Sequence, residues 1–239
     1  MIMQRYFTDK KQDNTFILNE NDLYHIKTVM RMNDFDQIEV VYEKEVYTCY
    51  IKYSNTNIEV IIKEKIDYYE YPMPYISLVL PLLKEQKLDI ILQKATELGV
   101  NEIIFTNMTR SIIKLDDKKL ENKLIRWSRI CKEASEQSMR NTIPNLTFIR
   151  DFKALKELDG INIICSTQEK KKTVKNVLKN VSICDRINIV IGPEGGISPN
   201  EEEFLESNGF IKTTLGSRIM RVETVPIYLL SIINYEFME

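Results

Sequence analysis

From residue 75 onward, short apolar runs alternate with helical patterns, and this alternation most limits the folds open to the chain. The run Ile76–Leu83 is almost entirely apolar, as expected of a strand that is buried on both faces. Ile161–Cys165 and Ile187–Ile191 are further runs of this kind. Strands buried on both faces and separated by helices predict an α/β domain built on a parallel sheet.

The predicted helices carry apolar residues at intervals of three and four. One covers residues 88–98 and ends at Gly99, the residue most typical of a helix C-terminus. A longer one runs from about residue 116 to about residue 139. A third begins at Ser198, because this N-cap residue is followed by a proline and by the glutamate of a capping box. The last covers residues 225–237.

The first 72 residues have a different pattern. Segments 38–42, 46–51 and 58–62 are rich in β-branched and aromatic residues and are separated by polar turn residues, so they predict strands. A small barrel or sandwich fits this length. Prolines at positions 72 and 74 interrupt regular structure, so we place a domain boundary there, with a β domain at 1–72 and an α/β domain at 73–239.

Composition excludes several classes of protein. The chain has one histidine and four cysteines, none in a C-x-x-C pair, so we expect reduced, buried thiols and no metal site. The N-terminus lacks the apolar segment of a signal peptide, and no run of about 20 apolar residues occurs. We therefore expect a cytoplasmic protein that does not enter a membrane.

The net charge of −2 excludes a uniformly basic nucleic-acid coat but hides an uneven distribution. Residues 1–72 carry 9 basic and 13 acidic side chains, whereas residues 73–151 carry 13 basic and 10 acidic ones. The middle of the chain is therefore locally basic, which leaves a nucleic-acid surface possible there.

Three of the seven glycines lie in Gly192-Pro193-Glu194-Gly195-Gly196, between a predicted strand and the helix at Ser198. A glycine-rich segment in this place lets the backbone approach a ligand closely. An ordinary strand-to-helix turn is the alternative. No Gly-Lys-Ser/Thr follows, so the segment is not a phosphate-binding P-loop.

A second segment, from Leu215 to Thr224, follows the last predicted strand, Ile211–Leu215. Its arginines at 218 and 221 could bind a phosphate or a planar base, or could form a surface ion pair with Glu223. If the two strands are neighbours in a parallel sheet, both segments border one crevice at the strand ends.

Together the two segments resemble the signature of the small-subunit ribosomal RNA methyltransferase E family. The resemblance continues through Gln93–Val100, Thr109–Ser111, Arg126–Trp127 and Glu133–Arg140, and at the N-terminus through Gln4–Phe7 and His25–Arg31. Ile197, Met220 and Val225 stand where the family usually has Phe, Leu and Ala.

The resemblance implies an α/β fold of the SPOUT superfamily with a deep trefoil knot, preceded by a small PUA-like β-barrel that binds RNA. It implies methylation of N3 of a uridine in 16S ribosomal RNA of the small ribosomal subunit, with S-adenosylmethionine as cofactor, by a homodimer. The implied cofactor site comprises Ser166, Thr167, Ile191, Gly192, Pro193, Glu194, Gly195, Gly196, Leu215, Gly216, Ser217, Ile219, Met220 and Thr224.

Methylation at N3 requires loss of the uracil N3 proton, so a base or a group that stabilises the uracil anion is needed. Arg221 is our first choice for the stabilising role, and Arg218 and Glu223 are the other catalytic candidates. The base itself is not identified from the sequence. The expected RNA contacts are Arg5, Arg31, Arg110, Arg126, Arg129 and Arg140.

Alternatives remain open for the function, for two arginines and for the last helix. The chain could be a knotted methyltransferase that acts on another RNA base or on a ribose hydroxyl, or a non-catalytic RNA-binding module. Arg126 and Arg129, three residues apart on one helix, fit a solvated helix face as well as RNA contact. The C-terminal helix fits either a dimer interface or a core helix.

Overall fold

The computed structural model describes residues 3–54, 57–69 and 71–238. They form two compact units, one from Met1–Glu70 with Ser135–Thr142 and one from Tyr71–Ala134 with Ile143–Glu239. Segment 135–142, which lies in the second expected domain by sequence, thus groups with the first unit. The domain boundary at residue 72 stays a prediction.

The first unit is built on a six-stranded sheet in the order β1-β4-β5-β6-β3-β2. Its strands are β1 (Arg5–Phe7), β2 (Lys11–Gln12), β3 (Thr15–Phe16), β4 (Gln37–Tyr42), β5 (Glu45–Tyr53) and β6 (Ile58–Ile66). Only the β1–β4 pair is parallel. The three strands expected from the sequence are β4, β5 and β6, whereas β1–β3 are too short to show a periodic pattern. The PUA-like barrel stays a prediction.

One short helical segment belongs to the same unit. α1 (Glu20–Tyr24) is capped by Asn19, whose side chain accepts a hydrogen bond from the backbone N–H of Asp22. It continues directly into η1 (His25–Val29), a π-helical turn. Ile26 on this turn is fully buried against the sheet core. The helical segment of this unit therefore consists of two joined elements.

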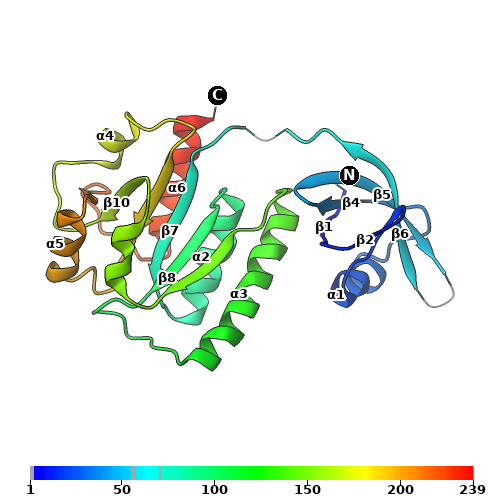
Figure 1. The fold of residues 1–239 in the computed structure, drawn as a ribbon, viewed down its shortest axis with the longest axis horizontal. Coiled ribbons are helices and arrows are strands. Elements are labelled where there is room, and N and C mark those ends of the chain that lie inside the picture. Colours follow the sequence, from blue (N-terminus) through cyan, green and yellow to red (C-terminus); the bar gives the residue numbers. More distant parts are fainter. Residues whose placement is uncertain (1–2, 55–56, 70, 239) are drawn as a thin grey trace. The chain divides into compact units, whose positions relative to one another are not determined.

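The second unit contains a six-stranded sheet in the order β12-β10-β11-β7-β8-β9, and every pairing in it is parallel. Strands β7, β8 and β10 of this sheet are labelled in Figure 1. Its strands are β7 (Tyr75–Pro81), β8 (Glu102–Thr106), β9 (Asn145–Ile149), β10 (Ile161–Cys165), β11 (Arg186–Val190) and β12 (Ile211–Thr213). Its helices are α2 (Glu85–Glu97), α3 (Asp117–Gln137), η2 (Phe152–Glu157), α4 (Val174–Leu178), α5 (Pro199–Ser207) and α6 (Thr224–Phe237). The predicted α/β class is confirmed, and the trefoil knot stays a prediction.

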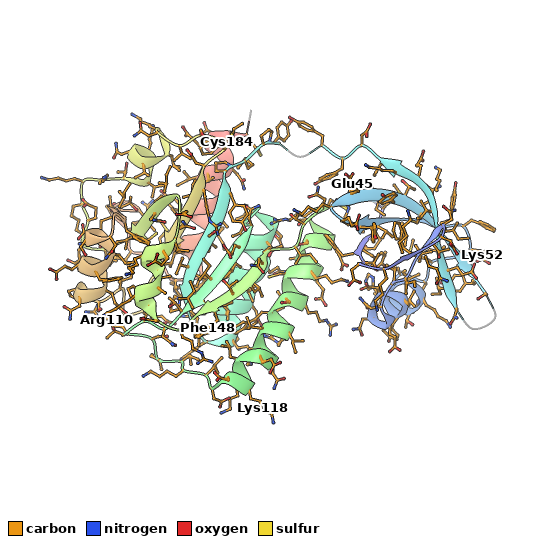
Figure 2. The ribbon with its side chains drawn as sticks, viewed as in Figure 1. Glu45, Lys52, Arg110, Lys118, Phe148 and Cys184 are labelled. Carbon is orange, nitrogen blue, oxygen red and sulfur yellow. The ribbon has the colours of Figure 1, made fainter. Side chains whose placement is uncertain are left out.

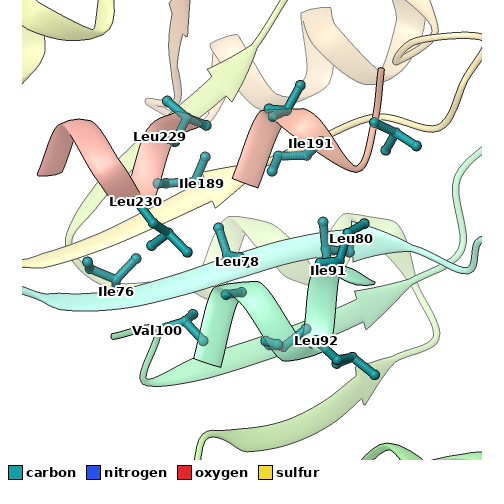
Figure 3. Packing of buried hydrophobic residues seen from close by; sticks show 14 of the residues in the cluster. Ile76, Leu78, Leu80, Ile91, Leu92, Val100, Ile189, Ile191, Leu229 and Leu230 are labelled. Carbon is teal, nitrogen blue, oxygen red and sulfur yellow. The ribbon is translucent and has the colours of Figure 1, made fainter. Parts of the chain in front are cut away.

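The central strand β7 is buried on both faces, as its apolar run predicts. Ile76, Leu78 and Leu80 belong to the larger core cluster, which also includes side chains of α2 and α6 (Figure 3). Val79 belongs to a second cluster, which contains Leu205 of α5. Successive side chains of a strand point to opposite faces, so one strand contributes to both cores. Each fully buried side chain of this size stabilises the fold by about 1.5–3 kcal/mol.

The C-terminal helix α6 is a core helix of this unit. Leu229, Leu230 and Ile233 are fully buried in the larger cluster, and Asn234 donates a hydrogen bond to the carbonyl of Leu98 at the end of α2. None of the helices in the described ranges is long and apolar enough to cross a membrane.

Candidate active site

A cavity of about 430 Å³ opens at the carboxyl ends of three neighbouring strands, β12, β10 and β11. Its walls come from segments 165–170 after β10, 191–196 after β11 and 214–225 after β12, together with Lys87 of α2. Open parallel sheets bind their ligands at this edge. The crevice expected from the two glycine-bearing segments is therefore present in the tertiary structure.

Most of the residues predicted to bind the cofactor line this cavity. They are Ser166, Thr167, Ile191, Gly192, Pro193, Glu194, Gly196, Leu215, Gly216, Ser217, Ile219 and Met220. The catalytic candidates Arg218, Arg221 and Glu223 lie on the same walls. The structure thus brings together residues from three separate stretches of the chain.

Gly195 and Thr224 are not among the cavity-lining residues, so their place in the cofactor site stays a prediction. A Cβ added at Gly195 would lie 3.5 Å from Cβ and Cδ of Arg110, so this position faces Arg110 rather than the cavity. Thr224 is the exposed first residue of α6.

The segment after β11 is held by contacts on several sides. Arg110, labelled in Figure 2, donates from Nη1 to the carbonyl oxygens of Gly195 at 2.7 Å and Ile197 at 3.4 Å. At Gly192 an added Cβ would lie 2.7 Å from the backbone nitrogen of Ile197, so only glycine fits the turn. The segment therefore has its shape before any ligand arrives.

The start of α5 reinforces this shape. Ser198 and Glu201 form the predicted capping box, in which each side chain bonds the other residue's backbone N–H. The same glutamate accepts a 2.7 Å hydrogen bond from the backbone N–H of Thr109. The carboxylate of Glu201 thus links the start of α5 to the segment after β8 that contains Thr109 and Arg110.

Ser166 has a structural hydrogen bond on the cavity wall. Its hydroxyl donates to Oε1 of Glu202 at 2.8 Å and accepts from the backbone N–H of Gln168 at 3.1 Å. Glu202 in turn pairs with Lys212 at 3.1 Å. The hydroxyl of Ser166 therefore shapes the segment after β10, and Thr167 is the exposed neighbour.

The segment after β12 is much less restrained. Gly216 has φ +112°, a conformation that side chains rarely adopt. The side chain of Ile219 is 86% exposed at the cavity wall. Neither Arg218 nor Arg221 makes a side-chain hydrogen bond or ion pair within ranges 3–54, 57–69 and 71–238. These groups are therefore available to a ligand.

Lys87 is a cavity residue that the sequence analysis missed. Its ammonium donates to Oε1 of Glu194 at 2.8 Å and lies 3.9 Å from Oε2 of Glu223. The hydrogen bond to Glu194 raises the pKa of Lys87, and the same bond lowers the pKa of Glu194. Both groups therefore stay charged near neutral pH. The sequence signal that could have pointed to Lys87 is its place in the first turn of α2, the helix that follows the central strand β7.

The cavity offers neither a reactive cysteine nor, among the described residues, a group of metal ligands. Burial raises the pKa of the Cys165 thiol to about 12, so the thiol stays protonated. Within the part of the chain that the structure describes, no three His, Cys, Asp or Glu side chains are grouped to hold a metal ion.

The predicted RNA contacts on α3 are engaged in ion pairs. Arg126 bonds both oxygens of Asp89, at 2.8 and 2.5 Å, and Arg129 bonds Glu133 one turn away at 2.8 Å. These pairs match the alternative interpretation of a charged, solvated helix face. Arg110 likewise is committed to the backbone after β11.

In the first unit, the predicted contacts Arg5 and Arg140 are buried, with exposures of 2% and 6%. The guanidinium of Arg5 bonds the carboxylate of Glu39 at 2.6 and 2.9 Å and the carbonyl oxygen of Met139. Both arginines are therefore corrected to structural residues of this unit. Arg31 is exposed, with φ +51°, and stays a predicted RNA contact.

Comparison with known proteins agrees with this site. A family model described as an RNA methyltransferase domain matches residues 70–234. The ribosomal RNA small subunit methyltransferase E of Bacillus subtilis is 35% identical over 98% of this chain and 97% of its own. The protein of that name from Mesomycoplasma hyopneumoniae is 35% identical over 96% of this chain and 98% of its own.

Solved structures show the same fold. The ribosomal RNA small subunit methyltransferase E of Neisseria gonorrhoeae, bound to S-adenosyl methionine, superposes with a TM-score of 0.84 at 26% identity over 98% of each chain. A methyltransferase from Legionella pneumophila in complex with the same cofactor has a TM-score of 0.88 at 25% identity, also over 98% of each chain.

Proposed function

Because the chain belongs to the ribosomal RNA small subunit methyltransferase E family, we propose that it transfers the methyl group of S-adenosylmethionine to N3 of a uridine in 16S ribosomal RNA. The observation that supports this most directly is the cavity at the ends of β10, β11 and β12, whose walls carry glycine-rich backbone beside the exposed arginines 218 and 221.

The residues present fit this cofactor. A volume of about 430 Å³ lies in the range of small-molecule sites, roughly 300–1,000 Å³. Ile191, Leu215 and Met220 offer apolar surface for an adenine ring, and the glycines leave backbone groups accessible. A sulfonium cofactor has no phosphates, so a cradle without a dedicated anion site suits it. When bound, this cofactor supplies an electrophilic methyl group.

The chain's own residues have two tasks in the reaction. The preformed segment after β11 positions the reactants, and positioning alone can supply a large part of the rate. The guanidinium of Arg221, exposed on the opposite wall, stabilises the negative charge that develops on the uracil oxygens as N3 loses its proton. Arg218, three residues earlier in the chain, is placed for a backbone phosphate of the same RNA.

The proposed substrate is the small ribosomal subunit, and its location implies a cytoplasmic enzyme. Arg31 of the first unit adds an RNA contact outside the cavity. The proposal includes a homodimer, as the family resemblance implies.

The deciding experiment is mass-spectrometric nucleoside analysis of isolated small subunits incubated with the protein and S-adenosylmethionine. We expect N3-methyluridine to accumulate with the wild type. Arg221→Ala should lower turnover about 100- to 1,000-fold while the cofactor affinity measured by calorimetry stays within about threefold. Methylation of a ribose hydroxyl or another base would favour the alternative enzyme, and no cofactor binding would favour a non-catalytic module.

A further inference from the structure

Glu223 is an acidic residue on the cavity wall whose carboxylate accepts no hydrogen bond from the described ranges of the chain. It stands at the N-cap position of α6 but makes no capping hydrogen bond there. Its side chain is only 19% exposed, and Oε2 is buried. A buried carboxylate oxygen without a donor is unfavourable, so a ligand that brings an N–H or O–H group is expected beside it.

Lys87 forms an ion pair with this carboxylate but does not donate a hydrogen bond to it. The 3.9 Å between Nζ of Lys87 and Oε2 of Glu223 is too long for a hydrogen bond, and the ammonium already donates to Glu194 at 2.8 Å. Three elements, α2 and the segments after β11 and β12, meet in this cluster.

Resting on the proposed function, we propose that Glu223 accepts the N3 proton of the target uracil and that Lys87, whose Nζ lies 3.9 Å from Oε2 of Glu223, is a positioning residue for this carboxylate. In the step, the N3–H bond breaks and the proton passes to Glu223. The N3 electron pair forms the new bond to the methyl carbon. The methyl–sulfur bond breaks, and its electron pair stays on sulfur as a neutral thioether.

The other charged or titratable groups that face the cavity are less suited to accept this proton. They are Lys87, Cys165, Lys170, Glu194, Arg218 and Arg221. The hydrogen bond to Glu194 raises the pKa of Lys87, and burial raises that of Cys165, so both hold their protons. Glu194 already accepts from Lys87. Glu223 is the cavity carboxylate that accepts no hydrogen bond from the described residues.

The test compares Glu223→Gln with a matched control, Glu203→Gln, on an exposed position of α5. We expect Glu223→Gln to slow N3-methyluridine formation about 100- to 10,000-fold at saturating cofactor. Cofactor affinity by calorimetry should change less than about threefold, and Glu203→Gln should match the wild type. A normal rate for Glu223→Gln, or a defect that disappears at saturating cofactor, would overturn the assignment.

The kcat of two Lys87 variants gives a second, independent readout. Lys87→Met removes the ammonium that lies beside Glu223, so kcat should fall at least about tenfold, whereas Lys87→Arg should keep kcat near its wild-type value. An unchanged kcat in Lys87→Met contradicts the positioning role. If the wild type forms another methylated nucleotide, the proposed function fails; if it forms N3-methyluridine and Glu223→Gln does too at full rate, only this inference fails.

Discussion

The two walls of the cavity differ sharply in how they are held. The segment after β11 is fixed by the hydrogen bonds from Arg110, by the Lys87–Glu194 ion pair and by the capping box at Ser198. The segment after β12 is anchored at its ends, where the N–H of Thr214 bonds the carbonyl of Lys172 and the carbonyl of Arg221 accepts from the N–H groups of Thr224 and Val225. A turn in which Thr214 and Gly216 bond each other lies at its start. Its side chains at 217–219 are exposed.

This difference suggests that the two segments bind different ligands. A braced backbone suits a cofactor of constant shape, because the site costs nothing to organise when the ligand binds. A loosely held segment with unpaired arginines and an exposed Ile219 suits an RNA substrate, whose backbone and base supply the missing partners. The following predictions test each half of this comparison.

The largest effect is expected from Gly192→Ala. The new Cβ would approach the nitrogen of Ile197 to 2.7 Å, so the braced segment must shift. Overpacking of this kind costs about 1–3 kcal/mol. We expect a melting temperature lower by roughly 3–10 °C and cofactor affinity weaker by at least about tenfold, measured by thermal unfolding and calorimetry.

Gly195→Ala is the matched control for that change. Its Cβ would make an ordinary 3.5 Å contact with Arg110, so affinity and melting temperature should stay close to the wild type. Equal damage from both alanines would mean that the bracing at Gly192 is not what shapes the site.

A medium effect is expected from Arg110→Met, which keeps the length of the side chain and removes the hydrogen bonds to Gly195 and Ile197. We expect cofactor affinity to fall about tenfold, with RNA affinity little changed. Calorimetry and RNA filter binding measure the two quantities separately.

Arg129→Met is the control here, because its exposed pair with Glu133 contributes only about 0.3–0.5 kcal/mol. If Arg110→Met instead weakens RNA binding and spares the cofactor, Arg110 is an RNA contact, as the sequence analysis first suggested.

The smallest effect on the fold is expected from Ile219→Ser in the loosely held segment. Because the side chain is exposed, the free energy of unfolding should change by less than about 0.5 kcal/mol. The KM for small subunits should rise about 3- to 10-fold if the RNA covers this residue. Ile125→Ser, 67% exposed on α3, should leave both quantities unchanged.

Much of the fold was predictable from particular segments. The apolar run at 76–83 predicted a strand buried on both faces, and β7 indeed contributes Leu78 to one core cluster and Val79 to the other. The start of α5 at Ser198 was predicted correctly, because a capping box is a local signal. Strand β9 was missed because this edge strand, Asn145–Ile149, mixes polar with apolar residues and has no fully buried position. Helix α4 was missed because its five residues are too few for a helical period.

The candidate site was predictable only in part. The two glycine-bearing segments were found because each combines a strand end, a glycine and a helix start within a few residues. Lys87 was missed, and Arg5 was assigned to the surface, because neither residue's neighbours in space are its neighbours in sequence. Arg5 meets Glu39, which is 34 residues away, and Lys87 meets Glu194, which is 107 residues away.

The sequence by itself determined the α/β alternation, the capped helix starts and the chemical character of the two segments, because these depend on periodicity and on contacts between near neighbours. Only the tertiary structure decided which strand ends are adjacent, which arginines are already paired, and that a lysine of α2 reaches both glutamates of the cavity. Those facts follow from the order of strands in the sheet, which no local pattern encodes.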